Sequence, residues 1–169
     1  MVTVHGRAIP DPGFPDDDGS AAPEVVAALT AYDSDPEAGT HAALAVLQHA
    51  RLLVPVVAVL GEVEYDEQGL ARDKTSDMAA VLITGRDGRT ALLSFTSTDA
   101  MRAWNPEARP VAVSTRQAAR AALQDGADAL LVDIAGPVLL AVDGQDLHDL
   151  ADDLVLLRVE GGWGWTRPL

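Results

Sequence analysis

The sequence predicts an α/β protein with a mixed β-sheet, in which one antiparallel hairpin and one βαβ crossover are covered by helices. Three observations support this fold class. Apolar residues recur at helical spacing after two Pro-Glu pairs near the N-terminus. Two apolar runs flank Asp87-Gly88, and residues 111–134 read as strand, helix and strand. With 169 residues, 48% of them hydrophobic, the chain is expected to form one domain with a real core.

The first residues predict a mobile arm over positions 1–21, followed by a single domain over 22–169. The stretch PDPGFPDDDGS has too few apolar residues to offset the entropy of ordering it. A calcium loop on Asp16, Asp17 and Asp18 is the alternative, but adjacent carboxylates lack the alternate spacing and the distal Glu of an EF-hand. We therefore predict no metal there.

A pair of helices is predicted next. The first begins at Pro23 and carries its apolar face as far as Tyr32. The second has Asp35 as N-cap and Pro36 at its first position, with an apolar stripe that we extend to Arg51.

The middle of the chain predicts strands. The run Leu52–Leu60 is typical of a strand buried on both faces, and Pro55, which cannot donate to a ladder, is expected at a bulge or at the strand start. The polar stretch Tyr65–Ser76 is expected to form an exposed loop. The segment Met78–Phe95 predicts an antiparallel hairpin, with Asp87-Gly88 in a type I′ turn.

Two capping boxes predict the helices that follow. Thr96 with Asp99 starts a short helix, and Ser114 with Gln117 starts a longer one, which ends before Gly126. Strands are then expected over 127–134 and 138–143, a short helix over 144–154, and a last strand before a Gly- and Trp-rich tail.

Charge and composition exclude several classes of function. The net charge of −14 repels phosphate backbones and anionic lipids, so neither a nucleic-acid partner nor a membrane partner is expected. The longest apolar run is too short to span a bilayer, and the N-terminus lacks the apolar core of a secretory signal. With no Cys, thiolate metal sites and Cys nucleophiles are excluded. We expect a cytoplasmic protein.

No catalytic residue, metal site or cofactor is predicted. The four His residues lack the i, i+3 or i+4 partners of a helical zinc site. The serines lack a Gly-x-Ser-x-Gly elbow. The segment Gly85–Arg89 contains two glycines but lies inside a hairpin. It therefore lacks the helix start that a nucleotide phosphate site needs.

One candidate ligand site follows from the predicted crossover, because open α/β sheets bind ligands outside the carboxyl ends of parallel strands. One strand leads into Ser114, Thr115 and Arg116 at a helix start, where free amides favour an anion. Its parallel neighbour ends at Asp133, and the four side chains are expected to line a small polar crevice. The alternative is that Ser114 only caps its helix, Thr115 is a surface residue and Asp133 only accepts backbone hydrogen bonds.

A candidate partner site lies in the tail. Trp163 and Trp165 alternate, so an extended tail presents both on one face, either to the core or to another chain. We expect self-association as a homodimer, through these tryptophans or through an uncovered sheet edge.

The order of motifs resembles the SseB N-terminal domain family of bacterial proteins, most closely over residues 52–150. The marks of this resemblance are Phe95-Thr96-Ser97, Arg102-Ala103-Trp104, Arg109-Pro110, Gly126-Ala127-Asp128 and Ala135-Gly136-Pro137. The resemblance implies a small soluble α/β domain and carries over no catalytic residues. We expect a non-enzymatic binding or regulatory domain that acts through protein contacts or a small ligand. The alternative is a small-molecule enzyme that uses hydroxyls and carboxylates without a metal.

Overall fold

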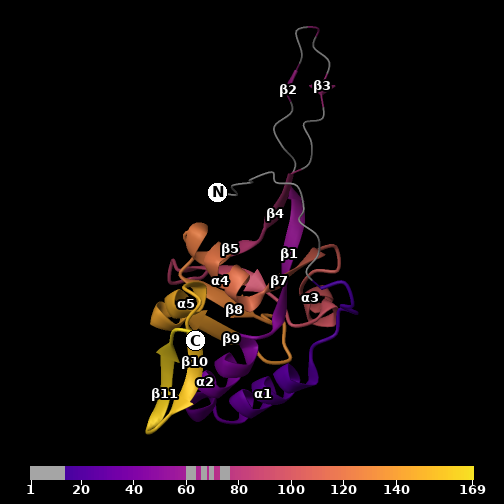
Figure 1. The fold of residues 1–169 in the computed structure, drawn as a ribbon. Coiled ribbons are helices and arrows are strands. Elements are labelled where there is room, and N and C mark those ends of the chain that lie inside the picture. The colour runs from indigo at the N-terminus through magenta and orange to yellow at the C-terminus, as the bar shows by residue number, and fades with distance from the viewer. Residues whose placement is uncertain (1–13, 60–63, 66–67, 69–70, 73–76) are drawn as a thin grey trace.

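The structure, a computed structural model, describes residues 14–59, 64–65, 68, 71–72 and 77–169. Helices in these ranges are α1 (Pro23–Ser34), α2 (Pro36–Leu47), α3 (Thr98–Trp104), α4 (Thr115–Gln124) and α5 (Gly144–Ala151) (Figure 1). The strands are β1 (Arg51–Val59), β2 (Glu64–Tyr65), β3 (Ala71–Arg72), β4 (Asp77–Ala80), β5 (Leu82–Thr84), β6 (Thr90–Ser94), β7 (Arg109–Ser114), β8 (Ala129–Val132), β9 (Leu140–Asp143), β10 (Val155–Val159) and β11 (Gly162–Thr166). The fold is α+β with mixed pairing and an N-terminal helical pair, as predicted.

The N-terminal helices begin where the sequence places them. The Asp35 side chain accepts a hydrogen bond from the Ala38 amide at 3.2 Å, and Pro36 takes the first helical position. The extension of the second helical stripe to Arg51 is wrong. The chain leaves the helix after Leu47, and Arg51 is the first residue of β1, because it pairs with Ser114 of β7.

The sheet is mixed, with β1 at the centre of one group of strands. β1 pairs antiparallel with both β4 and β7. In the second group β5 is antiparallel to β6, β6 is parallel to β8, and β8 is antiparallel to β9. A bridge between Leu53 and Phe95 joins the two groups. The parallel contact is thus between β6 and β8, and the chain crosses over through α3, β7 and α4.

One detail of the predicted crossover is wrong, because the strands on either side of α4 are not neighbours. β7 pairs with β1, and both β1 and β6 lie between β7 and β8. The periodicity of residues 111–134 indicates where each strand lies but not which strand it pairs with. Leu52 and Leu53 are both buried, on opposite faces, so β1 takes an inner position.

Pro55 lies in the middle of β1, neither at a bulge nor at the strand start. The residues on either side of it pair with different segments. Leu53 pairs with Phe95, which follows β6, and Val56 pairs with Ala80 of β4. The missing N–H of Pro55 therefore lies at the point where β1 changes partner. On the β7 side Pro55 is opposite Pro110, a pair that exchanges no hydrogen bonds.

The predicted hairpin is present, with two corrections. Its first strand is divided at Val81, so that β4 pairs with β1 and β5 pairs with β6. The turn is not type I′, because only Gly88 has a positive φ (81°) while Asp87 does not. Instead the Gly88 amide donates to the Gly85 carbonyl at 3.0 Å and the Gly85 amide donates to the Arg89 carbonyl at 2.8 Å. Residues 86–88 thus lie between the bonded residues Gly85 and Arg89, so the loop has one residue more than a two-residue turn.

Between β1 and β4 the predicted exposed loop is described only in part. Tyr65 belongs to β2, which pairs antiparallel with β3 at Tyr65 and Ala71. The remainder of the predicted loop lies outside the described residues, apart from Gln68.

Two apolar clusters lie on opposite faces of the sheet, because successive residues of a strand point to opposite sides. Leu52, Leu92 and Leu130 belong to the larger cluster, which includes residues of α1, α2, α4 and α5. Leu53 and Phe95 belong to the smaller cluster, with residues of α3. The C-terminal strands β10 and β11 form an antiparallel hairpin, and β10 contacts α2 (Figure 1).

Candidate functional site

The predicted crevice residues at the start of α4 form hydrogen bonds with backbone groups of the protein itself. The Ser114 side chain and Gln117 form the predicted capping box. Thr115 is not a surface residue: it is 0% exposed, and its hydroxyl donates to the Ala50 carbonyl at 3.0 Å. The Arg116 guanidinium donates to the Leu154 carbonyl at 2.6 Å. These side chains connect the start of α4 to the residues that precede β1 and β10.

Asp133 lies apart from α4, beside Thr96. Its side chain accepts a hydrogen bond from the Thr96 amide at 2.8 Å and one from the Thr96 hydroxyl at 2.7 Å. Asp133 is 1% exposed and has a φ of 57°, a left-handed conformation that Asp tolerates better than most residues. Burial raises the pKa of Asp133, while the two hydrogen bonds from Thr96 oppose this rise. The structure therefore brings Ser114, Thr115 and Arg116 together after β7 and places Asp133 after β8, with β1 and β6 between these two strands.

The partner of Asp133 explains why one predicted cap is displaced by a residue. Thr96 does not cap α3. Instead Ser97 is the N-cap, and its hydroxyl accepts a hydrogen bond from the Ala100 amide at 3.0 Å. Thr96 is buried beside Asp133, where its hydroxyl has a charged acceptor.

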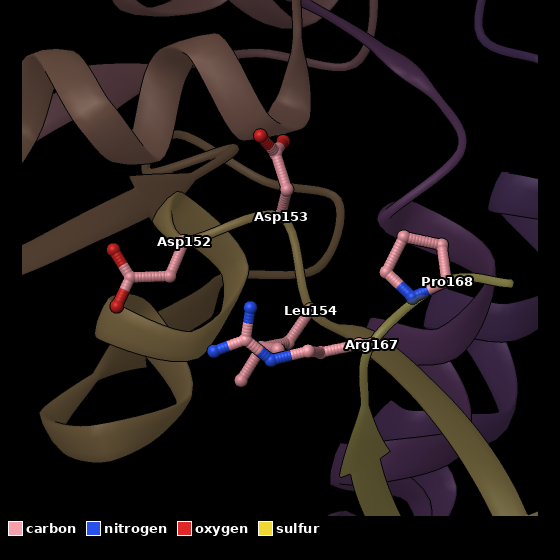
Figure 2. A pocket seen from close by; sticks show the side chains of 5 residues that line it. All are labelled: Asp152, Asp153, Leu154, Arg167 and Pro168. Atoms are coloured by element: carbon pink, nitrogen blue, oxygen red, sulfur yellow. The ribbon is translucent and has the colours of Figure 1, made fainter.

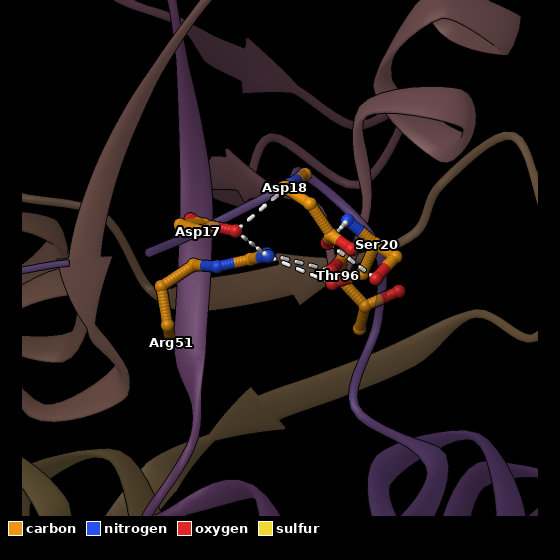
Figure 3. A network of polar contacts seen from close by, with 6 residues as sticks. Asp17, Asp18, Ser20, Arg51 and Thr96 are labelled. Carbon is orange, nitrogen blue, oxygen red and sulfur yellow. Dashed lines mark hydrogen bonds and ion pairs between the residues drawn. The ribbon is translucent and has the colours of Figure 1, made fainter. Parts of the chain in front are cut away.

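Arg51 is a polar residue whose position the sequence did not reveal. Its guanidinium donates to the Thr96 carbonyl at 2.8 Å, to the Asp17 carboxylate at 2.6 Å and to the Ser20 carbonyl at 2.8 Å (Figure 3). The Thr98 amide in turn donates to the Gly19 carbonyl at 2.7 Å. Residues 17–20 of the predicted arm thus lie against the domain, while residues 1–13 lie outside the described residues.

Asp17 and Asp18, two of the carboxylates considered for calcium, accept local hydrogen bonds. The Asp17 side chain binds the Gly19 amide at 2.9 Å, and the Asp18 side chain binds the Ser20 amide at 2.9 Å and the Ser20 hydroxyl at 2.5 Å. The hydrogen bonds from Ser20 lower the pKa of Asp18. In the part of the chain that the structure describes, no three His, Cys, Asp or Glu residues form a group that could hold a metal ion.

A pocket of about 560 Å³ lies beside Arg51. Residues 20–25, the end of α2 and the start of β1 line it, and its polar side chains are those of Ser20, Glu24, His49, Arg51 and Thr96. No motif in the sequence predicts this pocket, because its walls come from residues 20–25, residues 45–51 and Thr96, which are separate along the chain.

Trp163 and Trp165 point towards the body of the protein. Each is partly buried against the larger apolar cluster. The Trp165 indole N–H donates to Asp146 of α5 at 2.9 Å, and the Trp163 ring lies 5.6 Å from the Arg158 guanidinium carbon. Asp146 also contacts the His41 imidazole at 3.3 Å, so this carboxylate links α2, α5 and β11.

The opposite face of the C-terminal hairpin is apolar and uncovered. Leu157 and Val159 on β10 are 47% and 49% exposed and point to the same side of the strand. Their cross-strand partners are Gly164 and Gly162, which have no side chains to cover them. The result is an apolar strip, Leu157 and Val159, on the outer surface.

A second pocket of about 550 Å³ lies at the base of this hairpin. Asp152, Asp153, Leu154, Arg167 and Pro168 line it (Figure 2). Asp153 forms an ion pair with Arg120 of α4, and its carboxylate points away from that of Asp152. The charged side chains of this pocket are exposed, so water screens them.

The fold defines a small α+β domain whose mixed sheet is covered by helices on both faces, with a hairpin added at its C-terminal end. The model of the SseB protein N-terminal domain matches residues 25–149. The chain therefore belongs to the SseB N-terminal domain family, and the resemblance seen in its motifs is confirmed. Neither the curated proteins nor the solved structures include a significant match. The described part of the chain has no helix that is long and apolar enough to span a bilayer.

Proposed function

We propose that this chain is a non-enzymatic binding domain that acts through protein contacts in the cytoplasm, with the strip of Leu157 and Val159 as its contact surface. The observation that carries the proposal is the pairing of these two exposed side chains with Gly164 and Gly162. Full burial of a Leu or Val side chain contributes about 1.5–3 kcal/mol, so covering these half-exposed residues contributes about 1 kcal/mol each.

The surroundings of the strip support a role in binding. Hairpin strands need one buried face, and Leu156 with the two tryptophans already supplies it. The outer strip is therefore not needed to bury the hairpin, and its adjacent apolar side chains are available for contact with another protein. The strip and its glycine partners lie beyond residues 25–149, which the family model matches.

The alternative enzyme reading depends on residues that are already engaged. A nucleophile or general base must reach a substrate, but Asp133 is 1% exposed and both of its oxygens accept hydrogen bonds from Thr96. Thr115 is fully buried and donates to a backbone carbonyl. Binding of a small ligand is the second candidate, favoured by the pocket of about 560 Å³ beside Arg51.

The test is affinity capture from native lysate with the wild type and with the double variant Leu157→Lys, Val159→Lys. Proteins that the wild type captures are then purified and titrated against each variant. The matched control is Leu139→Lys, which changes a side chain that is also 47% exposed but lies outside the hairpin. Urea unfolding of every variant confirms matched stability.

We expect the double variant to lose the captured protein and the control to keep it. Two lost apolar contacts of about 1 kcal/mol each weaken binding by roughly thirtyfold, and the introduced charges add to this loss. Equal affinity of the double variant and the wild type would exclude the strip as the contact surface.

A further inference from the structure

Strand edges in this chain differ in how far their backbone groups are open to pairing with another strand. β7 pairs with β1 on one side, and its other side offers few donors. Pro110 faces Pro55 without exchanging a hydrogen bond, so its missing N–H falls on the outer side, as do the N–H groups of Ala112 and Ser114. The Ser114 amide donates to the Gln117 side chain at 2.9 Å. Among the described residues, the Ala112 N–H is the one donor on this edge without a partner, which makes the edge a poor template for another strand.

The outer edge of β10 is protected by a side chain. Gln48 is buried, and its amide group binds the Leu156 backbone as a neighbouring strand would. The Leu156 N–H donates to Gln48 Oε1 at 2.9 Å, and Gln48 Nε2 donates to the Leu156 carbonyl at 2.9 Å. Both backbone groups of Leu156 therefore point away from β11.

This arrangement fixes the direction of the backbone groups on β11. Leu156 is opposite Trp165, so this pair exchanges no hydrogen bonds, and the N–H and C=O of Trp165 point to the outer side of β11. Since the direction alternates along a strand, those of Trp163 point the same way. Within the described residues no hydrogen bond joins these outer groups to another segment. The edge has no Pro and no charged residue from Gly162 to Thr166.

We propose that β11 pairs with β11 of a second copy of this chain, antiparallel, about a two-fold axis at Gly164. In this register Trp163 is opposite Trp165 of the second copy, and the reverse. Both are pairs that exchange two hydrogen bonds, which gives four across the axis. Gly164 then faces its own equivalent, where two strands approach to about 4.5 Å between Cα atoms. A residue without a side chain fits that position.

The C-terminal hairpin lacks the negative charge of the chain as a whole, so charge does not oppose a second copy there. The chain has a net charge of −14, so two copies repel each other over most of their surface. Residues 154–169 contain two Arg and one Glu, and two positive minus one negative charge give +1 for this segment. The same register places Glu160 of one copy beside Arg167 of the other. Both are exposed and neither forms an ion pair among the described residues.

This inference deepens the proposed function, since it names a partner for the same hairpin. It rests on the backbone edge of β11, whereas the proposed function rests on the side chains of Leu157 and Val159. The Lys substitutions in that strip leave the outer N–H groups of β11 in place. Each proposal can therefore fail while the other holds.

The first test measures the mass of the full chain by light scattering as its concentration rises to about 1 mM, the weak end of specific association. We expect twice the mass of one chain. Gly164→Lys and Gly164→Glu each place like charges across the axis, and we expect each alone to weaken the dimer by up to about fivefold. A new Cβ at this position lies in ordinary contact with Val159, at 3.6 Å, so both variants are expected to fold.

An equal mixture of the Lys and Glu variants is the matched control, because opposite charges then face each other. We expect the mixture to regain the dimer mass. A wild type that stays monomeric throughout this range would overturn the proposal, as would variants that dimerise as well as the wild type. In either case the edge would be open to a peptide of another protein.

The second test is amide hydrogen exchange at low and high protein concentration. We expect the Trp163 and Trp165 amides to become protected as concentration rises. The Gly164 amide, which points to β10, is expected to be protected at every concentration. Unchanged exchange at both Trp amides in a sample of dimer mass would place the interface elsewhere and overturn the proposal.

Discussion

Replacing Thr96 with Val should destabilise the protein in a way that depends on pH, because it removes one of the two hydrogen bonds to the buried Asp133. The substitution keeps nearly the same volume and leaves the Thr96 amide in place. A hydrogen bond to a charged group contributes about 1.5–3 kcal/mol, so we expect the free energy of unfolding to fall by about 2 kcal/mol at neutral pH. For a chain of this size that corresponds to a loss of roughly 4–8 °C in Tm.

The sign of the pH dependence follows from the pKa of Asp133. Burial raises this pKa in the folded protein above its value in the unfolded chain. The contribution of Asp133 to stability is therefore fully present below the unfolded pKa and is lost as pH rises through the folded pKa. The Thr96 hydroxyl opposes that loss, because its hydrogen bond lowers the pKa of Asp133. The cost of Thr96→Val should thus be smallest in acid and grow as pH rises through the folded pKa of Asp133.

The assay is urea unfolding of the wild type and the variants at acid and neutral pH. Asp133→Asn provides the second arm of a double-mutant cycle, because Asn tolerates a φ of 57° and keeps an acceptor for the Thr96 amide. In that background Thr96→Val is expected to cost about 1 kcal/mol at every pH. The control Thr30→Val removes an exposed hydroxyl on α1. A cost of Thr96→Val that is the same in both backgrounds and independent of pH would refute the reasoning.

Two further predictions concern residues that hold outlying segments to the domain. Gln48→Ala removes both side-chain hydrogen bonds to Leu156, so unfolding should require about 2–3 kcal/mol less and the Leu156 amide should exchange faster, which hydrogen exchange can measure. Gly19→Ala should cost more stability in urea unfolding than Gly88→Ala. Both glycines have a φ of 81°, but only at Gly19 would a Cβ lie 2.3 Å from the Thr98 hydroxyl, and equal costs would contradict that contact.

Local signals predicted the ends of several elements correctly. Asp35 caps α2, Ser114 and Gln117 form the capping box of α4, and Gly126 follows that helix with a φ of 75°. Such motifs succeed because the donor and the acceptor lie within a few residues of each other. The turn at Asp87-Gly88 is a partial success, since the position is right but the turn type depends on the register of the flanking strands.

Polar residues with distant partners were predicted less well. Thr96 and Ser97 are adjacent hydroxyls, and the choice between them as N-cap depends on Asp133, which is 37 residues from Thr96. Arg51 reads as part of a helical stripe, yet it contacts Asp17 at a separation of 34 residues. No local pattern distinguishes these alternatives, because each depends on what the folded chain brings near.

The sequence by itself determined the family, the N-terminal helical pair, the position of the hairpin and the caps of α2 and α4, because these follow from motif order and periodicity over short stretches. Only the tertiary structure decided which strands are neighbours, and with them the candidate sites. Placing β1 and β6 between β7 and β8 separates Asp133 from Ser114, Thr115 and Arg116. The physical reason is that strand partners are selected by burial on both faces and by the backbone groups left unpaired, and these depend on segments that are far apart along the chain.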